Sequence, residues 1–554
     1  MRYLLILFLF LSACQKKAEY DVLIRNGKIY DGSGTEPFIG DVAIKDDKIV
    51  YVGPTLKDVR ARILVDATGK IVSPGFVNML SWSNESLIQD GRALSGIKQG
   101  VTLEVMGEGD SMGPFSNAQK KYNEENQGRI KYKVTWTTLG QYLRFLEKKG
   151  VSTNVASFVG AETIRVHELG FTDRKPSPQE LMRMKNLVSQ AMQEGAMGLS
   201  SALIYAPGSY AATEELTALA KAVAPHNGMY ISHLRSEGNR IDQALNELIT
   251  IAREARIPAE VYHLKMAGKD NWHKLDAMLH KIDSANKAGL TITTNMYNYT
   301  AGATGLDAAM PTWVQEGGLA EWRKRLRDPA IRQKVGLEMQ TAQKGWENLC
   351  LAAGPDKSLL IGFKQDSLEK YIGKTLTEVS EMRGTPWYET AMDLVIQDNS
   401  RVGVVYFMMS EENVKRQIAL PYMTFGSDAS SITPEGVFLE SNVHPRAYGN
   451  FTRLIQKYVR DEKVLSLSQA IHKLTALPCE RLKIKGRGRL RPGYYADVIV
   501  FDLDKMKENS TYEKPHQLSE GMEQVFVNGK QVLRDGAHTG VFPGKFVKGP
   551  GYKK

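Results

Sequence analysis

Eight short apolar runs, most of them separated by a helical segment, constrain the fold of this chain more than any other feature. Their sequences are PGFVNML, VTLEVMG, NVASFVG, AMGLSSALIY, MYISHLR, AEVYHLK, LTITTNMYNY and PYMTFGSD. Between two of these runs, residues 239–257 carry Ile241, Leu245, Leu248 and Ala252 at helical spacing. Eight strands alternating with helices predict a (β/α)8 (TIM) barrel, whose active site lies at the carboxyl ends of the strands.

The two ends of the chain have a different sequence pattern, which is typical of β-hairpins. YDVLIRNGKIYDG and GDVAIKDDKIVYVG alternate apolar and polar residues around turns, and YYADVIVFDLDK and MEQVFVNGKQVLRDG repeat this pattern near the carboxyl end. We therefore expect residues 20–73 and 481–554 to form a small β-sandwich domain beside a barrel over residues 74–480. The stretch from about 305 to 402 is too long for one loop and is expected to be an insertion after the seventh strand.

The amino terminus predicts export. MRYLLILFLFLSACQKK has an early arginine and an apolar run that fits a signal peptide but is too short to span a bilayer. Leu11-Ser12-Ala13-Cys14 resembles the bacterial lipobox, so residues 1–14 are expected to be a signal peptide that ends in a lipidated Cys14. The protein would then be a membrane-anchored lipoprotein of the bacterial cell envelope, on the periplasmic side or the surface. A plain secretory signal with an incidental cysteine is the alternative.

Charge and cysteine content exclude some classes of protein. The formal net charge of +10 is spread along the chain and its short basic clusters carry few aromatic residues, which argues against a nucleic-acid partner. The other two cysteines, Cys350 and Cys479, lie far apart in the sequence, so a disulfide framework is not expected. No sequence pattern indicates an oligomeric state.

Polar side chains at the ends of the predicted strands are the candidates for chemistry. The fifth, sixth and eighth strands end in ISHLRSEG, VYHLKMAG and FGSDASS, which place His233, His263 and Asp428 at the mouth of the barrel. The second strand ends in EVMGEGD and offers the carboxylates Glu104, Glu108 and Asp110. A single buried histidine is commonly structural, but two on adjacent strands with a nearby carboxylate suit a divalent metal with an open coordination position.

Motifs distributed over nearly all of the chain after residue 20 resemble one known family. They are DVLIRNGKIYDGSG, VDATGKIVSPGF, GLSSALIYAPGSYA, SHLRSEG, HLKMAG, GSDAS, HPRAYGNF, ADVIVFD and VFVNGKQVLRDGAHTGVFPG. In this order they resemble the D-aminoacylase (N-acyl-D-amino-acid deacylase) branch of the amidohydrolase superfamily. The resemblance implies a metal-dependent barrel, usually with zinc, that hydrolyses an amide bond.

The resemblance also assigns the metal ligands. His233 and His263 match two ligands, Asp428 matches the catalytic acid/base, and Glu108 is the best candidate for the third ligand, with Glu104 left open. The first strand of the family normally ends in His-x-His, but this chain has Leu80 and Trp82 there. We therefore expect one zinc ion, other divalent metals being alternatives, and expect Trp82 to form an apolar wall against the acyl group.

On the substrate side, the resemblance implies that three side chains bind the substrate carboxylate: Lys265, Tyr297 and Arg446. The alternative is that both cations only pair with local acids such as Glu237. Tyr205 would line the pocket or serve packing, while Arg235 and Glu237 would orient His233.

These expectations amount to hydrolysis of a linear amide, with an N-acyl-D-amino acid or a short peptide containing a D-residue as the small-molecule substrate. Two alternatives remain open: an inactive barrel that only binds peptides or amino-acid derivatives, and a hydrolase of cyclic amides.

Overall fold

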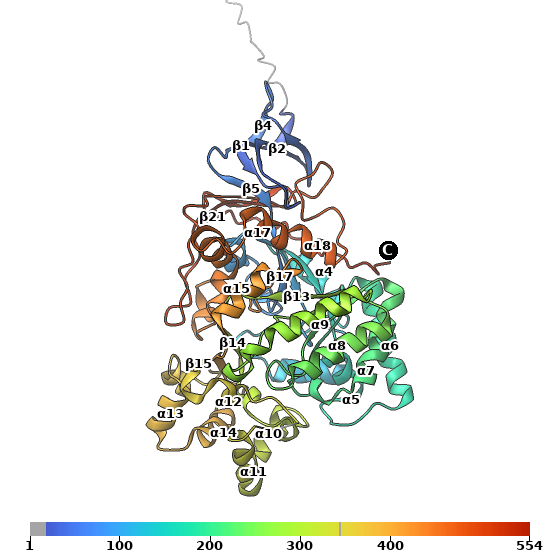
Figure 1. Ribbon diagram of the computed structural model, residues 1–554, viewed down its shortest axis with the longest axis vertical. Helices are drawn as coiled ribbons and strands as arrows, with labels where there is room; N and C mark the ends of the chain where they lie inside the picture. Colours follow the sequence, from blue (N-terminus) through green and yellow to red (C-terminus); the bar gives the residue numbers. More distant parts are fainter. Residues whose placement is uncertain (1–17, 343–344, 554) are drawn as a thin grey trace, which may run out of the picture.

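The computed structural model describes residues 18–342 and 345–553. Within these residues, no helix is both long enough and apolar enough to cross a membrane. The predicted lipidation residue, Cys14, lies outside the described residues. Figure 1 shows three parts along the long axis: a sheet at one end, a barrel in the middle, and a group of helices, α10 to α14, at the other end.

The eight apolar runs form the barrel. Its strands are β6 (Phe76–Ser81), β7 (Val101–Met106), β8 (Asn154–Ser157) with its continuation β9 (Val159–Gly160), β10 (Gly198–Ala202), β11 (Met229–His233), β12 (Ala259–Val261), β13 (Ile292–Met296) and β17 (Met423–Phe425). All neighbouring strands that pair are parallel, and a parallel bridge between Ser81 and Ala429 joins the first strand to the end of the last. The predicted (β/α)8 barrel is therefore confirmed.

The helices that follow the strands bury one apolar face against the barrel. In α8 (Ile241–Ala255), the residues spaced at helical intervals, Ile241, Leu245, Leu248 and Ala252, are at most 1% exposed. Full burial of each large aliphatic side chain contributes roughly 1.5–3 kcal/mol. The other barrel helices are α1 (Ser86–Gln89), α2 (Leu94–Ile97), α3 (Asn117–Glu125), α4 (Leu139–Lys149), α5 (Ala161–Leu169), α6 (Pro178–Glu194), α7 (Thr213–Val223), α9 (Leu275–Lys287), α15 (Glu411–Ala419), α16 (Arg446–Arg453), α17 (Leu467–Leu474) and α18 (Ala476–Arg481).

The two chain ends meet in one nine-stranded sheet. The amino end supplies β1 (Tyr20–Ile29), β2 (Phe38–Lys45), β3 (Lys48–Gly53), β4 (Ala61–Asp66) and β5 (Ile71–Pro74); the carboxyl end supplies β18 (Val498–Phe501), β19 (Met522–Val527), β20 (Lys530–Arg534) and β21 (Ala537–His538). Antiparallel pairing of β5 with β18 joins the two sets. A separate cluster of buried side chains, including Val22, Ile24, Val42, Val498 and Phe526, gives this sheet its own core.

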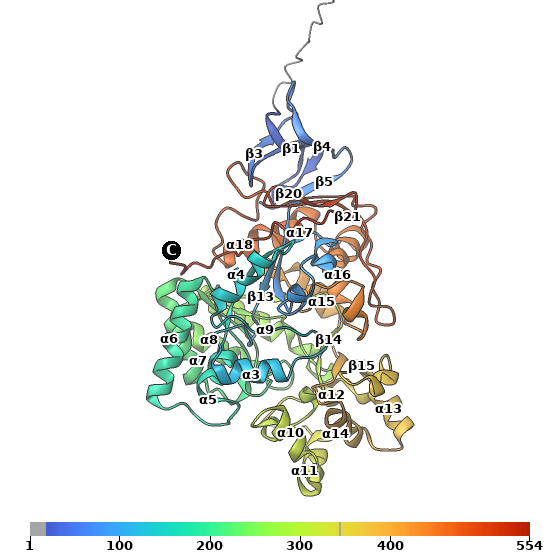
Figure 2. The same ribbon diagram turned by 180° about the vertical axis from the view of Figure 1, so that it is seen from behind.

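The long segment before the last barrel strand folds as a unit of its own. Its three-stranded antiparallel sheet has the order β14 (Ala301–Gly305), β16 (Gly403–Phe407), β15 (Ser358–Gly362). Its helices are α10 (Leu319–Arg325), α11 (Pro329–Met339), α12 (Leu349–Ala353), α13 (Leu376–Arg383) and α14 (Trp387–Asp398). Because β14 pairs with β16, Ala301 lies opposite Phe407 and the segment leaves and rejoins the barrel at one place. Figures 1 and 2 both show it at the end of the molecule away from the terminal sheet.

Candidate active site

A cleft of about 1050 Å³ lies at the carboxyl ends of the barrel strands, and the inserted segment contributes residues 302–305, 361–364 and 399–403 to its lining. Nearly every residue that the sequence nominates lines this cleft: Trp82, Glu108, Tyr205, His233, Glu237, His263, Lys265, Tyr297, Asp428 and Arg446. The exceptions are Arg235 and the alternative ligand Glu104. The fold thus brings together side chains from seven barrel strands or the segments that follow them.

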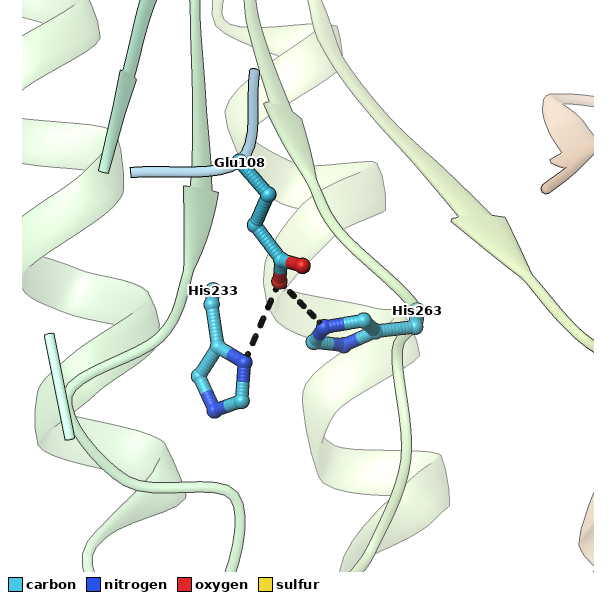
Figure 3. A group of neighbouring side chains, drawn as sticks. All are labelled: Glu108, His233 and His263. Atoms are coloured by element: carbon cyan, nitrogen blue, oxygen red, sulfur yellow. Dashed lines mark hydrogen bonds and ion pairs between the residues drawn. The ribbon is translucent and has the colours of Figure 1, made fainter. Parts of the chain in front are cut away.

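Glu108, His233 and His263 converge on one point of the cleft. Glu108 Oε1 lies 2.7 Å from His263 Nε2 and 3.3 Å from His233 Nδ1, and one ligand atom from each residue lies within 4.8 Å of the others. Figure 3 shows the carboxylate reaching down between the two imidazole rings. All three side chains are buried. Two imidazoles and one carboxylate form a donor set that suits zinc with an open coordination position.

The backbone at the strand ends aims two of the site residues. His263 and Asp428 have φ angles of +33° and +48°, a region that residues other than glycine rarely adopt. Hydrogen bonds hold both conformations: His263 N donates to Asn295 Oδ1 at 2.8 Å, and Asp428 N donates to Leu80 O at 2.9 Å. Backbone outliers of this kind cost about 1–3 kcal/mol each and are commonly found at functional sites.

Glu104, the alternative ligand, lies elsewhere in the barrel. Its carboxylate is fully buried and accepts hydrogen bonds from Asn78 Nδ2 at 2.7 Å and from Ser431 Oγ at 2.5 Å. Burial raises the pKa of this carboxyl group. The structure therefore brings Glu108, and not Glu104, to the histidine pair.

Glu237 contacts the histidine pair, whereas Arg235 binds a helix of the barrel. Glu237 Oε1 lies 3.1 Å from His263 Nδ1 and Oε2 lies 3.5 Å from His233 Nε2, so this carboxylate faces both imidazoles from the side away from Glu108. Arg235 was expected to orient His233, but Glu247 binds its guanidinium through Nε and Nη2, each at 2.9 Å. Arg235 therefore ties the loop after β11 to α8.

Neighbouring charges set the pKa values at the site. Burial alone would raise the pKa of Glu108, but the charge of His263 and hydrogen bonds from both imidazoles hold it well below its usual range. Burial and Lys265 would lower the pKa of His263, yet the carboxylates of Glu108 and Glu237 raise it to about 9. Burial raises the pKa of Asp428. The charge of Arg446 acts to lower this pKa, and the charge of Glu108 acts to raise it further.

The three residues expected to bind a carboxylate are buried side by side. The Arg446 guanidinium lies 4.3 Å from the centre of the Tyr297 ring, and Lys265 Nζ lies 5.5 Å from it. Each cation also has a carboxylate partner: Lys265 pairs with Glu237 at 2.6 Å, and Arg446 pairs with Asp428 at 2.9 Å. The pairing with local acids that the sequence left open is therefore present in the structure.

Comparison with known proteins finds relatives over nearly the whole chain. A model of the amidohydrolase family matches residues 412–533. D-aminoacylase of Alcaligenes xylosoxydans xylosoxydans is 29% identical over 532 residues, covering 95% of this chain and 97% of the relative, and N-acyl-D-glutamate deacylase of the same organism is 27% identical and covers 93% of each. The chain is a homologue of the D-aminoacylases, within the amidohydrolase superfamily.

Solved structures agree with this assignment. A crystal structure of D-aminoacylase matches with a TM-score of 0.79 and 28% identity, covering 96% of this chain and all of the other. N-acyl-D-glutamate deacylase of Bordetella bronchiseptica, complexed with zinc and a phosphonate that mimics the tetrahedral intermediate, matches with a TM-score of 0.78 and 27% identity, covering 96% and 99%. A D-aminoacylase structure described for its binuclear metal centre, with one-metal activation and second-metal attenuation, also has a TM-score of 0.79, 28% identity and the same coverage as the first.

Trp82 contributes more to this D-aminoacylase homologue than the apolar wall that was expected. Its indole N–H lies 3.0 Å from Glu108 Oε2 and 3.0 Å from Asp428 Oδ1. Glu108 Oε2, the oxygen turned away from the imidazoles, and Asp428 Oδ1 therefore both accept from this one N–H. Leu80, the other residue at this strand end, is buried in the barrel wall and does not line the cleft.

Beside Tyr205, which the sequence nominated, the cleft is lined by residues that the sequence analysis missed or left unused. Tyr205 packs edge-on against His233, with ring centres 5.3 Å apart, and Arg401 from the inserted segment lies 5.0 Å above the Tyr205 ring. Arg401 also pairs with Asp307 at 2.7 Å. Glu162 also lines the cleft, and burial together with the charge of Asp110 raises its pKa to about 8. Tyr205, Asp110 and Glu162 follow predicted strands, whereas Arg401 and Asp307 belong to the inserted segment, where strand-end position gave no signal.

Proposed function

We propose that the protein is a zinc-dependent amidohydrolase that removes the acyl group from N-acyl-D-amino acids or cleaves a short peptide at a D-residue. The observation that carries this proposal is the convergence of Glu108, His233 and His263 beside Asp428, in one cleft with two buried cations. The named activities of the homologous deacylases support the same reaction.

The donor set fits zinc, and Glu108, His233 and His263 would hold it. His233 turns Nδ1 toward the Glu108 carboxylate at 3.3 Å, whereas its buried Nε2 makes no hydrogen bond among the described residues and lies 3.5 Å from Glu237 Oε2, so Nδ1 is the nitrogen that faces the proposed metal position. Zinc bound there would lower the pKa of a water molecule toward neutrality and polarise the amide carbonyl. The relative with bound zinc supports this choice of metal.

Asp428 is the group that would move the proton. Its carboxylate lies at the mouth of the barrel, and burial raises its pKa, which favours a group that both accepts and returns a proton. It would take a proton from the attacking water and deliver it to the leaving nitrogen. Arg446, 2.9 Å from Oδ2, keeps the carboxylate from rotating away.

Lys265, Tyr297 and Arg446 would bind the carboxylate of the amino-acid half of the substrate. Two cations and a phenol match a carboxylate through charge-assisted hydrogen bonds, and the guanidinium can bind both of its oxygens. Since Arg446 also touches Asp428, a substrate carboxylate held there would place the scissile amide beside the acid/base. A fixed carboxylate also fixes which face of the α-carbon is presented, which supports selectivity for one enantiomer.

We also propose that the protein is anchored in the bacterial cell envelope through a lipidated Cys14. The lipobox-like Leu11-Ser12-Ala13-Cys14 supports this proposal. The first described strand, β1, belongs to the terminal sheet, at the end of the molecule away from the inserted segment that lines the cleft (Figure 1). An anchor before β1 would leave the cleft open to small molecules in solution.

A substrate panel tests the proposed reaction. The purified protein, loaded with zinc, is assayed on matched N-acyl-D- and N-acyl-L-amino acids, with release of the free amino acid as the readout. We expect hydrolysis of the D-series, and Asp428→Asn should lose turnover by at least about 100-fold while keeping its zinc. Absence of hydrolysis in both series after zinc loading would contradict the proposal.

A further inference from the structure

We infer that Trp82 is a positioning residue of the metal centre: its indole N–H holds Glu108 with one oxygen toward the two imidazoles and fixes Asp428 beside it. The inference rests on the proposed function and assigns this residue a role in the same site. Its basis is one donor placed 3.0 Å from an oxygen of each carboxylate.

The four oxygens of the two carboxylates are divided among different partners. Glu108 turns Oε1 to His233 and His263 and Oε2 to the indole. Asp428 turns Oδ1 to the indole and Oδ2 to Arg446. Indole N–H can only donate, so both contacts leave the carboxylates as acceptors. The indole therefore determines which oxygen of Glu108 is available to a metal and keeps the other occupied.

Hydrogen bonds where the barrel closes fix the main chain of Trp82. Trp82 N donates to Ala429 O at 3.1 Å, and Ser430 Oγ donates to Trp82 O at 2.7 Å. Because Asp428 N in turn donates to Leu80 O, the first and last strand ends are hydrogen-bonded on both sides of the Trp82–Asp428 contact. The register of the barrel thus holds the main chains of Trp82 and Asp428 side by side, and the indole reaches Asp428 from there.

A neutral N–H also suits the electrostatics at this point. Two buried carboxylates close to one donor repel each other, and the positive end of the indole dipole reduces that repulsion without adding a charge that would compete with the metal. Removing a residue that hydrogen-bonds to a metal ligand, without binding the metal itself, commonly lowers metal affinity by about 10–100-fold.

The test compares Trp82→Phe, which keeps an aromatic ring but lacks the N–H, with Trp313→Phe. Trp313 is a matched control because its Nε1 donates to a carboxylate oxygen, Glu338 Oε2, at 3.0 Å, and it does not line the cleft. Full-length proteins are loaded with zinc, and loss of zinc to a chelator is followed over time. Turnover and KM are measured on the same samples.

We expect Trp82→Phe to retain zinc about 10–100-fold less well than the parent, and kcat to fall more than KM changes. Trp313→Phe should match the parent in both measurements. If the Phe variant does not fold, benzothienylalanine introduced at position 82 replaces the N–H by sulfur and keeps the bicyclic shape. Zinc retention equal to the parent in a folded variant without the N–H would overturn the inference.

This experiment separates the inference from the proposed function. If the parent protein hydrolyses none of the amides tested, the proposed function fails, but zinc retention still reports on the indole. If the amides are hydrolysed and zinc retention does not depend on the N–H, only the role of Trp82 fails.

Discussion

Glu104 and Glu108 lie close together in the sequence, yet their side chains have different surroundings. Glu104 lies within β7 and is enclosed in the barrel by Asn78 and Ser431. Glu108 lies beyond the end of β7, where the flanking Gly107 and Gly109 have φ angles of +93° and +68° and turn the chain toward the histidines. An added Cβ at Gly107 would lie 2.4 Å from Phe158 O, so this turn requires glycine.

These two glutamates give a matched pair of variants for the metal site. Glu108→Gln replaces the carboxylate beside the imidazoles with a weaker, neutral ligand, so we expect most of the bound zinc to be lost on dialysis. Glu104→Gln should keep zinc and turnover and reduce the free energy of unfolding by about 1 kcal/mol. Metal analysis and thermal denaturation measure both effects, and loss of zinc in the Glu104 variant alone would contradict the ligand assignment.

The sequence identified the histidines and Asp428 because each follows a recognisable strand. It favoured Glu108 but left Glu104 open, since the two carboxylates lie only four residues apart at the end of the same predicted strand. The contact between Trp82 and Asp428 was also out of reach, because these residues are 346 positions apart and meet only when the barrel closes.

At the scale of elements, a buried lysine joins two helices around the last barrel strand. Lys473, in α17, donates from Nζ to Ile418 O at 2.6 Å and to Leu420 O at 2.5 Å, near the carboxyl end of α15. A cation at this end of a helix satisfies carbonyl groups and interacts favourably with the helix dipole. Burial lowers the pKa of Lys473 to about 8.

This lysine predicts a dependence of stability on pH. Its pKa in the folded protein is about 8 and its ordinary value is 10.5, so between these values the unfolded chain binds more protons. Stability contributed through this group should therefore increase as the pH rises from about 8 to 10.5, by at most about 1.4 kcal/mol per pH unit. Denaturant unfolding of the parent and of Lys473→Met measures this effect. As the pH rises from about 8 to 10.5, the free energy of unfolding of the parent should increase relative to that of the variant. A difference between the two free energies that does not change with pH would contradict the assignment.

Strand and helix patterns predicted the eight barrel strands and their helices, because each element has its own periodicity. The inserted segment was expected only as an insertion. Its β14–β16 pairing joins residues about a hundred positions apart, and such long-range pairing leaves no local pattern in the sequence.

At the scale of the whole molecule, the inserted segment makes the barrel mouth into a cleft. It contributes residues 302–305, 361–364 and 399–403 to the lining, while the terminal sheet lies at the opposite end (Figure 2). The groups proposed for catalysis come from the barrel, and Arg401 comes from the inserted segment. This arrangement separates the residues proposed for chemistry from those that could distinguish one acyl group or side chain from another.

A zinc titration tests directly whether the protein hydrolyses an amide at a centre that holds one metal. The protein is freed of metal with a chelator, zinc is added in fractions of an equivalent, and hydrolysis of an N-acyl-D-amino acid is measured at each step. We expect turnover to rise linearly and to reach its maximum at one zinc per chain, held by Glu108, His233 and His263. Turnover that appears only with a second equivalent, or that never appears, would contradict it.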